Sequence, residues 1–150
     1  MDYTAVKGLQ SEIFVPITPP PVWTPVTKEL KDMKIAFATA AGVHLKSDKR
    51  FNLAGDFTYR IIPGDAKTSD LMVSHGGYDN ADVNKDINCM FPIDRLRELA
   101  EEGFIKEVAP VHIGFMGGGG NQEKFSHETG PAVAKILKEE NVDAVVLTAG

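Results

Sequence analysis

Apolar residues gather in two short segments whose pattern is typical of strands in a parallel sheet. Residues 35–38 read Ile-Ala-Phe-Ala, and residues 142–148 contain Val145, Val146 and Leu147 in continuous order. Continuous apolar runs of this length indicate strands that are covered on both faces. We therefore predict a buried parallel strand at each of these two places.

A third strand is predicted by alternation instead of a continuous run. Val111, Ile113 and Phe115 are apolar, and His112 and Gly114 lie between them. A period of two is typical of a half-buried strand, so His112 is expected on the face opposite the core. Two further candidate strands lie at residues 57–62 and 71–74.

Two segments have the spacing of amphipathic helices. Residues 92–102 carry apolar side chains at helical spacing, and the glycine that follows them stands where a left-handed C-terminal cap is expected. Residues 122–140 carry a second apolar stripe. Gly130 and Pro131 predict a division of this second helix, with Pro131 in the first turn of the second piece and Thr129 as its cap.

Strands that alternate with helices indicate an α/β fold with a mainly parallel sheet and flanking helices, of the Rossmann or flavodoxin type. We assign residues 34–150 to this domain. We expect it to be incomplete at its C-terminus, because no helix follows the last strand to cover the sheet. Residues 1–33 hold five of the nine prolines and predict an extended proline-rich arm that packs against protein through Trp23.

Composition and charge exclude several functional classes. The chain has 150 residues and a formal net charge of -5, which argues against binding nucleic acid by neutralising phosphates. No segment approaches the ~20 apolar residues that span a bilayer. Cys89 is the single cysteine, so an intrachain disulfide and a four-cysteine zinc site are excluded, and a cytoplasmic location is expected. We predict no metal site.

Glycines and one histidine at predicted strand ends are the best candidates for a binding site. His75 is the best histidine for proton transfer or for orienting a substrate, but a lone histidine identifies no reaction and a hydrogen-bonded loop histidine is the simpler interpretation. The glycine run lacks the spacing of a nucleotide fingerprint, so a plain loop, a substrate contact and a subunit contact stay open. Cys89 is expected to be a small buried residue. The candidate contacts are His75, Gly76, Gly77, Tyr78, Gly117, Gly118, Gly119 and Gly120.

Four motifs carry a resemblance that covers essentially the whole chain. They are HGGYDN at residues 75–80, DVNKDINCMFPIDRL at 82–96, GFMGGGG at 114–120 and DAVVLTAG at 143–150. The chain resembles the selenoprotein B family of glycine, sarcosine and betaine reductases, and within it the selenocysteine-bearing subunits of D-proline reductases. In that family a similar last strand leads into a loop with the catalytic selenocysteine.

The resemblance implies that the selenocysteine comes immediately after Gly150, beside Thr148 and Ala149. A UGA codon read as a stop, or a designed truncation, would account for its absence. The implied reaction is reductive ring cleavage of D-proline to 5-aminovalerate in amino-acid fermentation, by a selenolate that attacks Cα. The implied partners are a subunit with a pyruvoyl group, which makes the ring nitrogen a better leaving group, and an electron-donor protein or dithiol.

This interpretation makes the protein one part of a hetero-oligomer, with no cofactor in this chain and with no catalytic residue of its own among the 150. The fragment is then expected to be inactive. An alternative from another functional class, a binding domain instead of an enzyme subunit, is a non-catalytic α/β domain that binds a partner through the proline-rich arm and the glycine run. The codon after Gly150 separates the two hypotheses, because only the first requires UGA followed by an open reading frame.

Overall fold

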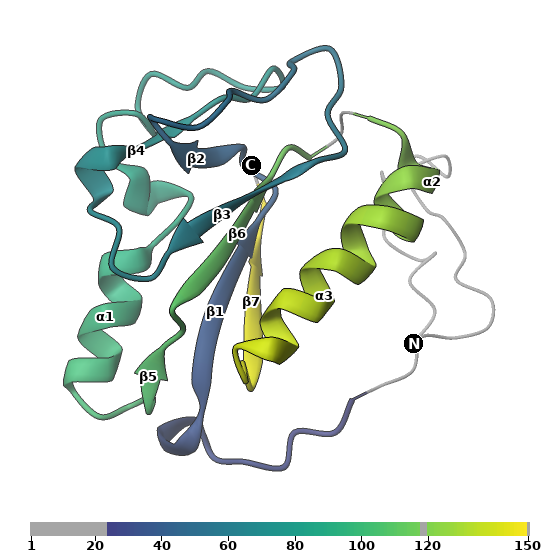
Figure 1. The fold of residues 1–150 in the computed structure, drawn as a ribbon. Helices are drawn as coiled ribbons and strands as arrows, with labels where there is room; N and C mark the ends of the chain where they lie inside the picture. Colours follow the sequence, from purple (N-terminus) through teal and green to yellow (C-terminus); the bar gives the residue numbers. More distant parts are fainter. Residues whose placement is uncertain (1–23, 118–119, 150) are drawn as a thin grey trace, which may run out of the picture.

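A five-stranded, mostly parallel and curled sheet forms the centre of the molecule (Figure 1). The computed structural model describes residues 24–117 and 120–149. Most of the predicted arm, including Trp23, and the glycines at 118, 119 and 150 lie outside the described residues. Of the arm, residues 24–33 are described; residues 24–32 are exposed, with a 3-10 turn at Leu30–Asp32, and Met33 is buried in the core.

Strand β1 (Lys34–Thr39) is the central strand and has parallel neighbours on both sides. On one side lie β5 (Glu107–Val108) and β6 (Val111–Phe115), one after the other, and on the other side lies β7 (Ala144–Thr148). Strand β3 (Tyr59–Pro63) pairs antiparallel with β6 at the edge. The predicted mainly parallel α/β sheet is therefore confirmed.

Alternating side chains of β1 build a separate core on each face of the sheet. Ile35 and Phe37 belong to the larger cluster, which also receives Leu96 of helix α1 (Ile93–Glu101). Ala36 and Ala38 belong to the smaller cluster with Leu137 of helix α3 (Gly130–Glu139). Because neighbouring strand residues point to opposite faces, the two helices flank the sheet on opposite sides. Figure 1 shows α1 and α3 on either side of the strands.

Helix α1 forms where its spacing predicts it, and its ends explain its length. Asn88 lies in the 3-10 turn Ile87–Cys89, and its side-chain oxygen accepts a hydrogen bond from the Asp94 amide at 3.1 Å. This bond satisfies a free N–H of the first turn. Beyond the other end, Gly103 has φ +73°, the left-handed conformation that glycine adopts at little cost.

The predicted boundary within residues 122–140 is present, since α3 begins at Gly130 with Pro131 in its first turn, but the predicted break in the helix is not. Helix α2 (Gln122–Lys124), a π-helical turn (Phe125–Thr129) and α3 follow one another without a break. Thr129 is helical and does not cap α3, because its hydroxyl donates to the Phe57 carbonyl instead. Gly130 has no Cβ to clash with the ring of Pro131, so the residue before this proline can stay helical. The wider π turn also suits a proline that has no N–H to donate.

The expected exposure of His112 is also wrong. Strand β6 is buried on both faces, and His112 is 0% exposed. Two more residues lie between Val108 and Ile113 than between their β1 partners, so the parallel ladder is interrupted there. The Phe37 amide falls at this interruption and donates to His112 Nδ1 at 2.9 Å. The imidazole therefore replaces a missing strand carbonyl.

The predicted burial of the last strand is contradicted as well. Strand β7 exists and pairs with β1 along its whole length, but its three central residues, Val145, Val146 and Leu147, are exposed. Among the described residues, β7 has a neighbour on one edge only, and nothing packs closely enough on its two faces to bury these side chains. The continuous apolar run predicts a strand correctly, but it does not determine what covers that strand.

A small two-stranded antiparallel sheet lies over the carboxyl end of the main sheet and carries the candidate histidine. It consists of β2 (Val43–Leu45) and β4 (Leu71–Val73), the latter preceded by a 3-10 turn at Thr68–Asp70. The His44 ring is buried and shares a 2.8 Å hydrogen bond with the Ser74 hydroxyl. This contact ties β2 to the residue directly before His75.

Candidate functional site

The carboxyl ends of β1, β6 and β7 meet at a single residue, Ala40. The Ala40 amide donates to the Thr148 carbonyl at 2.9 Å, and the Gly117 amide donates to the Ala40 carbonyl at 2.8 Å. A Cβ on Gly117 would lie 3.0 Å from the Ala40 Cβ, so this approach favours glycine. Ala40 therefore bridges the start of the glycine run and the end of β7, because both are hydrogen-bonded to it.

His75 closes this arrangement from the small sheet. The Gly77 amide donates to His75 Nδ1 at 2.9 Å, so this nitrogen carries no proton. Nε2 then carries the proton and donates to the Gly117 carbonyl at 3.2 Å. A Cβ on Gly77 would lie 2.8 Å from the ring, so glycine is needed for the ring to fold back. The structure thus joins His75 to the glycine run.

Tyr78 supports the His75 ring. The two rings stack with centroids 4.7 Å apart and an interplanar angle of 29°. The Tyr78 hydroxyl donates to the Ala41 carbonyl at 2.8 Å, and burial raises the pKa of Tyr78. The phenol therefore stays protonated at neutral pH and holds the HGGY segment against the chain that follows β1.

Thr148 links the end of β7 to the segment that contains the single cysteine. Its hydroxyl donates to the Met90 carbonyl at 3.0 Å. Cys89, the residue before Met90, is exposed, so the expectation that it is a small buried residue is wrong. Sequence reasoning missed this neighbourhood because 58 positions separate Met90 from Thr148 and no local signal connects them.

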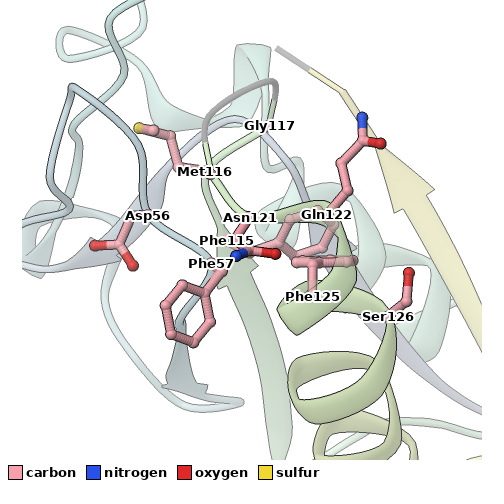
Figure 2. A pocket seen from close by; sticks show the side chains of 10 residues that line it. Asp56, Phe57, Phe115, Met116, Gly117, Asn121, Gln122, Phe125 and Ser126 are labelled. Carbon is pink, nitrogen blue, oxygen red and sulfur yellow. The ribbon is translucent and has the colours of Figure 1, made fainter.

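A cavity of about 420 Å³ lies on the other side of Gly117, between the end of β6 and the start of α2 (Figure 2). Its aromatic wall includes Phe115 and Phe125, whose ring centroids are 5.2 Å apart. Asn121 and Gln122 supply polar groups at its rim. The volume is within the range of pockets that bind small molecules.

Asp56 places a negative charge in the lining of this cavity. Burial by itself would raise its pKa, but hydrogen bonds from the Thr58 side chain and from the Asn52 and Thr58 amides, together with the Arg60 charge, lower the pKa of Asp56 overall. The carboxylate is therefore ionised at neutral pH. Gly120, with φ +149°, lies against the backbone of Asp56 and not beside His75.

Among the predicted site residues, the structure joins His75, Gly77, Tyr78, Gly117 and Thr148 through direct contacts or through Ala40 and Ala41. Gly76 and Ala149 are exposed next to them in the chain. Ala40 was missed by sequence reasoning, because its role comes from two backbone hydrogen bonds that any residue type could make.

No three His, Cys, Asp or Glu side chains in residues 24–117 and 120–149 are grouped so that they could hold a metal ion. Within the same residues, no helix is sufficiently long and apolar to cross a membrane.

The site therefore lies at the strand ends of an α/β sheet, where the histidine segment and the start of the glycine run meet beside the last strand. Comparison of the sequence with known families identifies the class of protein. Residues 7–150 match the family model of glycine/sarcosine/betaine reductase selenoprotein B (GRDB), and the chain belongs to this family.

Among its relatives is D-proline reductase subunit gamma of Acetoanaerobium sticklandii, which is 77% identical over 149 residues, covering 99% of this chain and 62% of that protein. Sarcosine reductase complex component B subunit beta of Peptoclostridium acidaminophilum is 34% identical over 95% of this chain and 35% of its own length. Glycine reductase complex component B subunit gamma of Carboxydothermus hydrogenoformans is 31% identical with the same two coverages. No solved structure matches the chain. The chain therefore spans less than two thirds of each of these relatives.

Proposed function

We propose that the chain is part of the selenocysteine-bearing subunit of a D-proline reductase. The observation that carries this proposal is the difference in identity, which is 77% to a D-proline reductase subunit but only 30–34% to sarcosine and glycine reductase subunits. A gap of this size favours D-proline over the other two substrates. The enzyme is an oxidoreductase that cleaves the D-proline ring to 5-aminovalerate.

The sheet order supports a Rossmann or flavodoxin-like domain over residues 34–150, completed by further chain beyond its C-terminus. The chain runs from β1 to β6 on one side of β1 and then crosses to β7 on its other side. The direction in which strands are added to the sheet therefore reverses at β1. In open α/β sheets, ligands bind outside the carboxyl ends of the strands at such a reversal. We therefore place the active site at Thr148, Ala149 and Gly150.

In the proposed reaction a selenolate directly after Gly150 attacks Cα of D-proline. The bond between Cα and the ring nitrogen breaks, and the nitrogen takes the electron pair and a proton. A thiol then attacks selenium and forms a selenium–sulfur bond, while Cα keeps the electron pair of the broken selenium–carbon bond and takes a proton. A dithiol or electron-donor protein supplies the two electrons that reduce the selenium–sulfur bond. A pyruvoyl group on the partner subunit would make the ring nitrogen a better leaving group, and on this proposal the chain contributes no cofactor of its own.

The residues around the strand ends would position this reaction. His75 already uses both ring nitrogens, one with Gly77 and one with Gly117. It therefore suits the orientation of the glycine run better than proton transfer. We propose that residues 75–78 and 117–120 contact the substrate or the partner subunit. The cavity beside Gly117 is large enough for a small cyclic amino acid.

We further infer a cytoplasmic hetero-oligomer of this subunit with its pyruvoyl-containing partner. The first test is the nucleotide sequence after the Gly150 codon, where we expect UGA and an open reading frame. The second test is formation of 5-aminovalerate by the full selenoprotein with the pyruvoyl subunit and a dithiol. An ordinary stop codon, or preference for sarcosine or glycine over D-proline, would contradict the proposal.

A further inference from the structure

Strand β7 presents apolar side chains to solvent on both faces of the sheet. Val145, Val146 and Leu147 are 36%, 42% and 75% exposed. Their β1 partners are Ala36, Phe37 and Ala38, which are at most 4% exposed. Paired residues of parallel strands point to the same face, so Val145 and Leu147 lie on the α3 face and Val146 on the α1 face. Neither helix reaches far enough to cover them.

The two edges of the sheet differ in how they are protected. At the β3 edge, Arg60 donates to the Lys49 carbonyl at 2.8 Å and to the Thr58 hydroxyl at 2.8 Å, which holds the preceding loop against the strand. Pro63 has no N–H to offer to another strand. Charges, prolines and covering loops are the usual protection of free edges.

Among residues 24–117 and 120–149, the β7 edge has none of these features. Its sequence from Ala144 to Thr148 is AVVLT, with no charge and no proline. Among the described residues only β1 pairs with it. Parallel strands that are buried on both faces are continuous apolar runs. Strand β7 therefore has the composition of an interior strand although it lies at an edge.

The handedness of the existing crossovers indicates where the covering helix belongs. The chain leaves β6, passes over β1 through α3 and enters β7. A crossover that continues in the same direction is right-handed only if its helix lies on the same face as α3. Such a helix would cover Val145 and Leu147.

We propose that the free edge of β7 pairs with a parallel strand from the part of the full-length protein that this chain lacks, with a crossover helix packed on Val145 and Leu147. The chain covers 62% of D-proline reductase subunit gamma, so more than a third of that relative is available to supply both elements. This inference rests on the proposed completion of the domain. It adds the edge, the strand direction and the face.

The test is complementation by a second polypeptide. The probe is the part of the Acetoanaerobium sticklandii subunit without a counterpart in this chain, made separately with cysteine at any selenocysteine position. Binding to this chain is measured by titration calorimetry, and the assembled mass by sedimentation. We expect a one-to-one complex in which the β7 amides that do not pair with β1 become protected from hydrogen exchange.

Leu147→Lys places a charge where the helix should pack and is expected to weaken binding by at least about tenfold. The matched control is Ile61→Lys on β3, because Ile61 is also an exposed edge residue at 44%; binding should change by less than about twofold. Val145→Lys repeats the test independently. Thermal melting of each free variant should match the parent chain, since these side chains are exposed before the complex forms.

Equal binding of the parent and Leu147→Lys chains, or no binding of the probe to the parent, would overturn the inference. So would a dimer of this chain that Leu147→Lys abolishes while probe binding survives, because β7 would then be the contact between two copies. These outcomes are separate from the activity of the full selenoprotein with its pyruvoyl partner. If the full selenoprotein proved inactive on D-proline, a positive binding result would still stand. If the probe did not bind, activity of the full selenoprotein would still support the proposed function.

Discussion

The imidazole of His112 supplies a hydrogen-bond acceptor that the sheet lacks where β5 ends and β6 begins. Its Nδ1 accepts from Phe37, and its buried Nε2 has no partner among the residues that the structure describes. Burial, and secondarily the charge of Arg97, lower the pKa of His112 to about 4. The neutral ring is therefore the form that the native state requires.

This lowered pKa makes stability depend on pH in a defined direction. Between the unfolded value of about 6.5 and the native value of about 4, the unfolded chain binds the extra proton, so stability rises with pH. The contribution of His112 is fully present above pH 6.5 and is lost as the pH falls towards 4. The loss by pH 4 amounts to about 3 kcal/mol.

The variant His112→Gln should remove this dependence, because an amide oxygen can accept from Phe37 and does not titrate. From urea unfolding at pH 7 and pH 4, we expect the parent chain to lose about 3 kcal/mol more than the variant over this interval. The comparison removes the contribution of the carboxylates, which both chains share. An equal loss in the two chains would show that His112 is not held neutral.

At the scale of elements, strand β6 depends on the absence of a side chain at Gly114. A Cβ there would lie 1.9 Å from the Val43 carbonyl oxygen of β2, a distance at which the backbone must move. This close approach holds the small sheet, and with it the His75 segment, against the main sheet.

Gly114→Ala should therefore lower the free energy of unfolding by more than about 2 kcal/mol, as overpacking against backbone does. Gly103→Ala is the control, because Gly103 has open space around it and only its positive φ disfavours alanine. Its cost should be about 1–2 kcal/mol. Urea unfolding of both variants measures the difference, and a smaller loss for Gly114→Ala than for Gly103→Ala would contradict the close contact.

Elements whose signals are local were predicted well, and those that depend on distant neighbours were not. Helix α1 has its apolar stripe and terminal glycine within one short segment, so its position follows from the sequence. The continuity through Pro131 depends on the missing Cβ of Gly130 and on a π turn. A rule that treats Gly-Pro as a break does not include this combination.

For the whole molecule, the main prediction is that this chain alone does not reduce D-proline. Mixed with the pyruvoyl-containing subunit and a dithiol, it should form no 5-aminovalerate above the level without the chain, because the proposed nucleophile follows Gly150. The full selenoprotein in the same mixture is the positive control. Turnover by the 150-residue chain would contradict the proposed position of the nucleophile.

The sequence by itself determined the family, the α/β class and the segments that form the three parallel strands named in advance, because motifs and apolar runs are local properties of a chain. It also drew attention to His75 and the glycine run, since strand ends with glycines are common binding sites. That these two segments touch required the structure, because 42 positions separate His75 from Gly117.

Only the tertiary structure decided which side chains are covered. His112 and Leu147 both lie on strands that pair with β1, yet the histidine is fully buried and the leucine is 75% exposed. Hydropathy alone would predict the reverse. Burial depends on which other segments pack against a strand, and those segments come from distant parts of the sequence. A strand at the centre can thus bury a polar ring that has a partner, while apolar side chains on an edge strand can remain exposed.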